Sequence, residues 1–201
     1  MRHSRRGVRW VAAAQLAAAC ASLAACGSSP PVQFFALEPA VRADAPRRQS
    51  STVVQVARVH VPPALDRQQI VHQGGSGTLT LSDRSRWGAP LDEMARRVLS
   101  QDLLRLLPQD CVILPEEPAP AATEKIVVDI VQFAADATGT VQFAASWSLV
   151  SATLGARPHN HYLELSEPAD AQDQGAQVRA MSDILAKLAE QIAAAVAAPQ
   201  G

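Results

Sequence analysis

The chain has 201 residues, about the length of one domain, and its 18 basic and 19 acidic residues give a formal net charge of −1 at pH 7. Because nucleic-acid binding depends on a surplus of positive charge that neutralises phosphates, this balance argues against a nucleic-acid partner.

The first 25 residues have the pattern of a secretory signal peptide. Four arginines in the first nine positions precede an apolar stretch, 10–25, that is shorter than the ~20 residues needed to span a bilayer. The sequence "LAAC", which ends at Cys26, resembles a bacterial lipobox, in which the cysteine is acylated and begins the mature chain. Cys20 is a weaker alternative for the acylated residue, because no leucine lies three positions before it. A second alternative is an ordinary secretory signal, in which Cys26 is not acylated. We therefore predict a signal peptide over 1–25, a lipidated tether over 26–32 and a folded domain over 33–201.

Removal of residues 1–25 would change both the charge and the cysteine content. The segment contains four arginines and no acidic residue, so the remaining chain is clearly acidic, and we expect its membrane contact to be the acyl anchor alone. Cys111 would then be the remaining free thiol, which excludes an internal disulfide. It lies in the apolar segment "CVILP", which favours a buried, inert thiol over a catalytic nucleophile.

The predicted elements alternate between strands and helices. A Pro- and Arg-rich loop, 38–52, separates the first two strands, and "GGSG" at 74–77 indicates a turn between two strands of a hairpin. Apolar residues at three- and four-residue spacings predict two amphipathic helices. The predicted helices cover 90–108 and 174–198, and the strands cover 33–37, 53–61, 68–73, 78–83, 111–115, 124–136, 140–152 and 159–166.

The patterns within these elements indicate how they pack. Strand 124–136 is apolar on both faces, which suggests a central position, whereas strand 140–152 alternates so that Trp147 faces the core. The order strands, helix, strands, helix predicts a single α+β domain, with a largely antiparallel sheet and two main helices packed on one face.

Motifs for catalysis, cofactors or metals are weak. The chain contains no Gly-x-Ser-x-Gly, His-Glu-x-x-His or Walker sequence. His159 and His161 would face the same way on a strand, but a metal site needs a third or fourth ligand, so a solvated strand end is the expected role. We therefore expect no catalytic residues, no metal site and no cofactor.

Several segments together resemble a known family. They are "VHVPPALDRQQIVHQ", "SRWGAPLDEMARRVLSQDLLRLL", "VVDIVQFAAD" with "VQFAASWSLV", and "RAMSDILAKLAEQIA". Their order and spacing resemble the ABC-type transport auxiliary lipoproteins, the paraquat-inducible protein C family. The long loop 38–52 and the segment "RPHNHYLE" depart from the family pattern, which leaves the contacts of these two segments open.

The resemblance implies a non-catalytic accessory protein. Members of the family are outer-membrane lipoproteins that work with a periplasmic carrier of the MCE type in moving phospholipid or other hydrophobic molecules across the envelope. The implied partners are the carrier, the membrane through the acyl chains of Cys26, and the lipid itself. Gly27 resembles the export-permissive residue of lipoprotein sorting, which implies the periplasmic leaflet of the outer membrane. A pilotin or lipopolysaccharide-assembly lipoprotein is an alternative, and a small periplasmic enzyme is a third.

The turn "LDR" and a nearby tryptophan carry two interpretations. In the first they are scaffold: Asp66 satisfies backbone amides, Arg67 pairs with an acidic neighbour, and Trp87 covers the start of a helix. In the second they dock the carrier, since Trp and Arg commonly anchor interfaces. The predicted docking residues are Leu65, Asp66, Arg67, Ile70 and Trp87.

Overall fold

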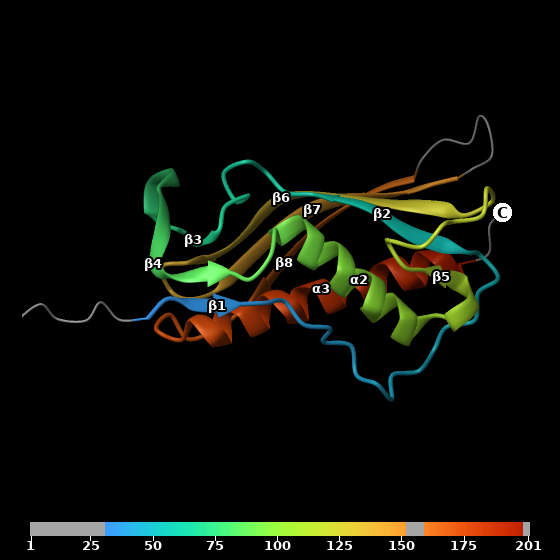
Figure 1. Cartoon of the computed structure of the whole chain (residues 1–201), viewed down its shortest axis with the longest axis horizontal. Coiled ribbons are helices and arrows are strands. Elements are labelled where there is room, and N and C mark those ends of the chain that lie inside the picture. Colours follow the sequence, from blue (N-terminus) through green and yellow to red (C-terminus); the bar gives the residue numbers. More distant parts are fainter. Residues whose placement is uncertain (1–30, 152–158, 199–201) are drawn as a thin grey trace, which may run out of the picture. The chain divides into compact units, whose positions relative to one another are not determined.

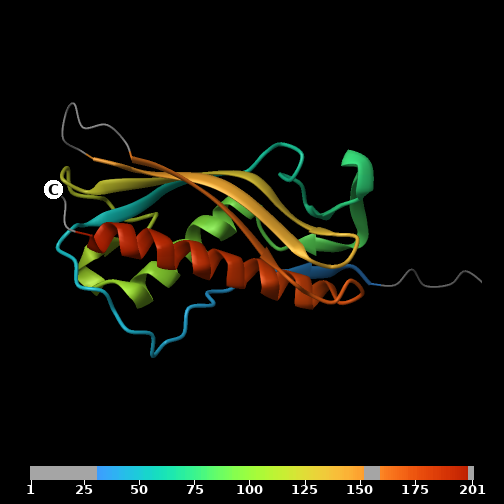
Figure 2. The ribbon, with the colours of Figure 1, turned by 180° about the vertical axis from the view of Figure 1, so that it is seen from behind.

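The structure is a computed structural model that describes residues 31–151 and 159–198. These residues form two long helices and one eight-stranded sheet (Figure 1). Helices α2 (Leu91–Leu106) and α3 (Gln174–Ala197) lie side by side on one side of the sheet (Figures 1 and 2). Side chains from the helices and the sheet form one hydrophobic core. The predicted single α+β domain with two main helices is confirmed.

Both helices end within two residues of their predicted limits. Pro90 precedes the first turn of α2, Asp92 and Glu93 lie in that turn, and Arg105 lies in the last turn, so the charges complement the helix dipole. The carboxylate of Asp173 caps α3 by accepting the Ala176 N–H at 3.0 Å.

Strand β6 (Glu124–Asp136) is the longest strand and lies in the middle of the sheet, as predicted. It pairs along one edge with β7 (Val141–Val150), which pairs in turn with β8 (His159–Glu167), and both ladders are antiparallel. Along its other edge, β6 pairs in parallel with β2 (Val54–His60) at one end and with β3 (Gln69–Gln73) at the other.

The remaining strands extend the sheet beyond β3 and β2. Strand β4 (Leu79–Trp87) is antiparallel to β3, and β1 (Gln33–Phe35) is parallel to β4, while the short β5 (Val112–Ile113) is parallel to β2. The sheet is thus mixed, although its longest ladders are the antiparallel ones. The parallel pairing of β2 with β6 follows from the helical crossover, because α2 lies between these two strands in the chain.

A bulge in β6 changes which face its side chains occupy. The register with β7 shifts between Ile130 and Gln132, and Val131 in the bulge is 62% exposed. Side chains with even numbers from 126 to 130 are buried before the bulge, whereas Phe133, Ala134 and Ala135 are all buried after it. The apolar character of both faces in the sequence therefore arises partly from this change of phase.

Gly139 forms the tight turn between β6 and β7. Its φ is +90°, and a Cβ at this position would lie 2.4 Å from the Ala169 carbonyl oxygen. A side chain is therefore excluded both by the backbone conformation and by the segment that precedes α3.

Candidate functional site

The predicted docking residues divide into an exposed pair and a buried group. Asp66 and Arg67 are exposed in a turn that backbone hydrogen bonds close, with the N–H groups of Leu65 and Asp66 donating to the Pro62 carbonyl at 2.8 and 3.0 Å. Leu65, Ile70 and Trp87 belong to the hydrophobic core, with exposed fractions of 6%, 2% and 5%.

Trp87 belongs to the hydrophobic core, and its backbone is hydrogen-bonded on both sides. Phe35 on β1 pairs with Trp87 on β4, the Trp87 N–H donates to the Gln68 carbonyl at 2.7 Å, and the next N–H, of Gly88, donates to the Phe35 carbonyl at 2.8 Å. The indole is therefore buried, as are the side chains of Leu65 and Ile70, and Asp66 and Arg67 are the exposed members of the predicted docking set. A docking surface at this turn consists of Asp66 and Arg67.

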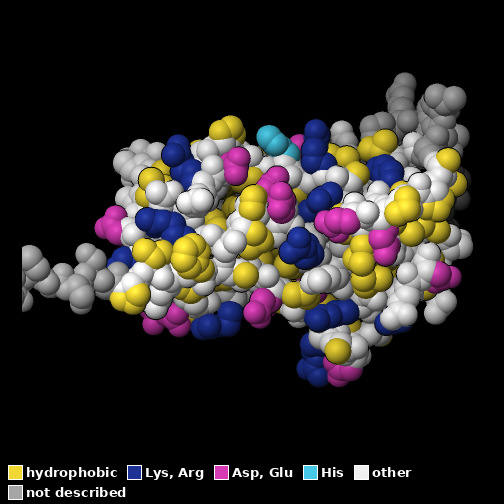
Figure 3. Space-filling view, viewed as in Figure 1, with side chains coloured by type: hydrophobic (Ala, Val, Ile, Leu, Met, Phe, Trp, Pro, Cys, Tyr) yellow, Lys and Arg dark blue, Asp and Glu magenta, His cyan; other side chains and the backbone are white. Residues whose placement is uncertain are grey.

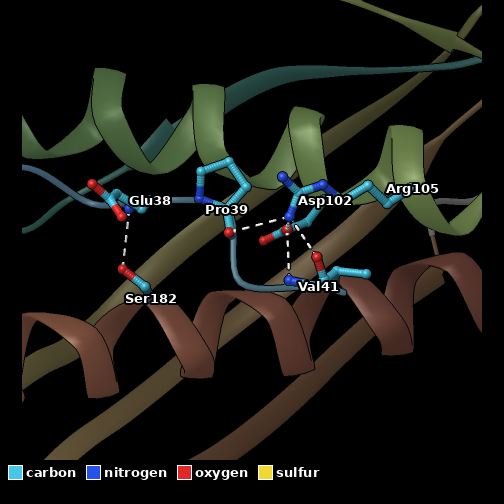
Figure 4. Close-up of polar contacts among 6 residues, drawn as sticks. All are labelled: Glu38, Pro39, Val41, Asp102, Arg105 and Ser182. Atoms are coloured by element: carbon cyan, nitrogen blue, oxygen red, sulfur yellow. Dashed lines mark hydrogen bonds and ion pairs between the residues drawn. The ribbon is translucent and has the colours of Figure 1, made fainter. Parts of the chain in front are cut away.

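The buried Asp102 and the partly exposed Arg105 connect the segment that follows β1 to helix α2 (Figure 4). The Asp102 side chain is fully buried, and its Oδ1 accepts the Val41 N–H at 3.0 Å. The Arg105 guanidinium donates to the carbonyl oxygens of Pro39, at 3.2 Å, and of Val41, and lies 3.8 Å from the Asp102 carboxylate. The two side chains therefore satisfy the backbone of an irregular segment that lies more than sixty residues away along the chain.

Sequence reasoning did not single out Asp102, although its spacing contains a signal. The position lies three and four residues after Leu99 and Val98 and four before Leu106, so it falls within the apolar face of α2. A carboxylate on a core-facing stripe requires a compensating partner. The sequence could not identify that partner, because a loop backbone at residues 39–41 supplies it.

Burial raises the pKa of the Asp102 carboxyl to about 6, while the hydrogen bonds from the backbone of residues 40 and 41 and the Arg105 charge act in the opposite direction. Among the described residues, its Oδ2 is a buried oxygen without a hydrogen-bond partner. The contact holds the backbone of residues 39–41 against α2. Because desolvation outweighs the favourable interactions, ionisation of the Asp102 carboxyl lowers the stability of the folded chain.

The raised pKa of Asp102 predicts a pH-dependent stability. Because the folded chain holds this proton up to about pH 6, whereas an unfolded Asp releases it near pH 4, the unfolding free energy should fall by about 2–3 kcal/mol as the pH rises through this interval. Asp102→Asn should remove this part of the slope, measured by urea unfolding at pH 4, 5, 6 and 7. Asp183→Asn, which changes an exposed carboxylate on α3, is the matched control. An unchanged slope in Asp102→Asn would contradict the assignment.

An open groove of about 480 Å³ lies between residues 34–40 and the first half of α3. The Glu38 N–H donates to Ser182 Oγ at 3.1 Å between its two walls, and Arg179 on the helix is paired with Asp173 at 3.3 Å. A mixed apolar and charged lining that is open to solvent is typical of a protein contact surface rather than of an enclosed ligand pocket.

The structure places His161 and Cys111 in different environments. The ring of His161 is exposed and stacks on Trp147, with centroids 4.1 Å apart, and the described residues contain no group of three or more His, Cys, Asp or Glu that could hold a metal ion. Cys111 is buried, as predicted; its thiol donates to the Ser50 carbonyl at 3.2 Å, and burial raises its pKa. His159 begins β8, next to the undescribed residues 152–158.

The membrane-related predictions concern residues outside the described ranges. Cys26 and Cys20, the signal segment 1–25 and all of the tether except residues 31 and 32 fall there. In residues 31–151 and 159–198, the structure shows no helix that is both long and apolar enough to cross a membrane.

Comparison with known proteins gives one family and a set of similar folds. A family model described as "ABC-type transport auxiliary lipoprotein component" matches residues 35–193. A crystal structure of an uncharacterized protein has a TM-score of 0.70 at 18% identity, covering 83% of this chain and 99% of its own. A crystal structure from Xanthomonas campestris, of family model DUF330, has a TM-score of 0.61 at 14% identity, covering 80% and 92%. No curated protein sequence matches.

Proposed function

The chain belongs to the family of ABC-type transport auxiliary lipoprotein components, and on this premise we propose that it is the lipid-anchored accessory of an ABC system that moves phospholipid or another hydrophobic molecule across a Gram-negative envelope. The observation that carries the proposal is the extent of the family match, which runs from the end of β1 to the last turns of α3. The match therefore covers most of the folded domain, and in this proposal the anchor precedes that domain directly.

In this proposal, Cys26 carries the acyl chains and holds the domain at the periplasmic leaflet of the outer membrane. Gly27, which follows the cysteine, supports the outer membrane over the inner membrane. The partner is an MCE-type carrier protein that delivers or collects the hydrophobic substrate at this membrane. The domain contributes binding and positioning and performs no chemical step.

The exposed pair Asp66 and Arg67 is the proposed contact with the carrier. Both side chains lie on a short turn whose backbone is fixed by hydrogen bonds to the Pro62 carbonyl, and whose neighbour Leu65 is anchored in the core. A rigid turn that presents an arginine loses little conformational entropy when it binds, which favours it as an interface residue.

Arg67→Ala should reduce binding of the carrier at least several-fold, while the melting temperature stays close to that of the wild type, because the side chain is exposed. The measurement is affinity purification of the acylated protein from solubilised membranes, with quantification of co-purifying proteins and lipids. Arg97→Ala removes another exposed arginine, on α2, and is the matched control. Equal recovery of the carrier by all three proteins would refute docking at this turn.

The same purification tests the function itself. Recovery of an MCE-type carrier and its ABC components with the wild-type protein supports the proposal. Recovery of a secretin or of lipopolysaccharide-assembly proteins instead would identify the chain as a pilotin or an assembly partner, and would refute the transport role.

A further inference from the structure

Exposed apolar side chains gather at the end of the domain where β1 begins. Val32, directly before β1, and Phe34, in β1, are 47% and 71% exposed, and Leu79 and Leu81, at the start of β4, are 48% and 45% exposed. Figures 1 and 2 show the β3–β4 hairpin and the start of β1 at the same end of the folded domain. Figure 3 shows hydrophobic side chains at this end, with charged side chains between them. We call these four residues the apolar end.

The apolar end differs from ordinary scattered exposure. Single exposed apolar residues are common on protein surfaces and need no explanation. Here Phe34 lies on β1, and Leu79 and Leu81 lie in the first part of β4, where it pairs with β3. The last residues of β4, 85–87, pair with β1. Phe34 is the most exposed of the large hydrophobic residues in the described part of the chain. Its neighbour Phe35 packs against the core, so the alternation of β1 directs one aromatic ring inward and the other into solvent.

The length of the chain before β1 limits where the apolar end can lie. The six residues that follow Cys26, 27–32, span at most about 20 Å when fully extended. If Cys26 is acylated, as the proposed function requires, the start of β1 must therefore lie within about 20 Å of the bilayer surface. The far end of β7, at Val150, lies nine residues along the strand from Val141, which is next to the β6–β7 turn.

We propose that the apolar end rests on the lipid surface, with the Phe34 ring inserted among the headgroups and the upper part of the acyl chains. Apolar side chains at an interface reach ~5–10 Å into this region. The contact is too small to hold the protein on the membrane without its anchor. It orients the domain, so that β1 and the β3–β4 hairpin face the lipid and the opposite end of the sheet points into the periplasm. The inference rests on the proposed lipid anchor.

The test uses the full acylated protein reconstituted in phosphatidylcholine vesicles. Phe34→Cys, Leu79→Cys and Val150→Cys are made in a Cys111→Ser background and labelled with an environment-sensitive fluorophore. Val150 is the matched control, an apolar residue with 38% exposure. Flotation with the vesicles reports the anchor, and quenching by phospholipid with a nitroxide near the glycerol end of its acyl chain reports contact of each labelled position with lipid.

We expect blue-shifted and quenched emission at positions 34 and 79, and neither effect at position 150. Phe34→Asp should reduce the quenching at position 79, whereas Glu38→Asp, at an exposed position already acidic, should leave it unchanged. Protein that floats without quenching at position 34, or with a blue shift alone, would overturn the inference, because the side chain then faces water or protein. Protein that does not float would overturn the anchor, and with it this inference.

Discussion

Replacement of Trp147 by alanine is expected to lower the free energy of unfolding by about 3–5 kcal/mol, as measured by urea or thermal unfolding. The side chain is 3% exposed, and the residue lies in the middle of the sheet, where it pairs with Val128 on β6 and His161 on β8. The indole is part of the core shared with the two helices, so its loss leaves a large cavity.

Two variants separate packing from other effects at this position. The Trp147 Nε1 is one of the buried polar atoms without a partner among the described residues, so Trp147→Phe keeps the aromatic packing, removes the unpaired N–H and should cost much less than alanine. Tyr162→Ala truncates an aromatic residue that is 62% exposed on the neighbouring strand and should change stability by about 0.5 kcal/mol or less. If Trp147→Ala melted within about two degrees of the wild type, the assignment of this face to the core would be wrong.

Cys26→Ser should transfer the protein from the membrane fraction to the soluble fraction, with no change in the melting temperature of the domain. The expectation follows from the proposed acyl anchor, in which several acyl chains contribute ~0.8 kcal/mol for each buried methylene group. The acidic domain provides no strong attraction to anionic lipid that would replace the anchor. The measurement is fractionation of cells after a high-salt wash.

Cys20→Ser is the matched control for Cys26→Ser. Cys20 precedes the predicted cleavage site, so its substitution should leave the protein in the membrane fraction. Release by Cys20→Ser would transfer the anchor to the alternative site. Retention of Cys26→Ser after the wash, in cells that lack the carrier, would refute acylation as the source of membrane attachment.

Hydrophobic periodicity in the sequence was sufficient to predict most elements. Strand β6 has the predicted limits, 124–136, and the helices agree within two residues. These predictions succeed because an element that buries one face repeats apolar residues at its own period, and because proline and glycine mark its ends. The placement of Trp147 in the core succeeded for the same reason, since the large apolar residues of β7 fall at alternate positions and share one face.

Boundaries and pairings were predicted less well where they depend on distant strands. Strand β4 continues four residues past its predicted end because Ser85, Arg86 and Trp87 pair with β1. The two strands are separated by about fifty residues that include a loop, so the local sequence does not indicate this parallel pairing. Trp87 lies in the hydrophobic core together with Leu65 and Ile70, so residue type alone did not indicate which of the predicted docking residues reach solvent.

The sequence by itself determined the family, the α+β class and the buried faces of the helices and main strands, because these depend on motif order and local periodicity. Only the tertiary structure decided which predicted docking residues reach solvent, why a carboxylate is tolerated inside α2, and where Phe34 is exposed. The Asp102 contact requires the backbone of residues 39–41, and the exposure of Phe34 depends on β1 lying at the edge of the sheet. Both features depend on contacts between segments far apart in the chain. These contacts, rather than the neighbouring residues, determine the free-energy cost of a buried charge or an exposed aromatic ring.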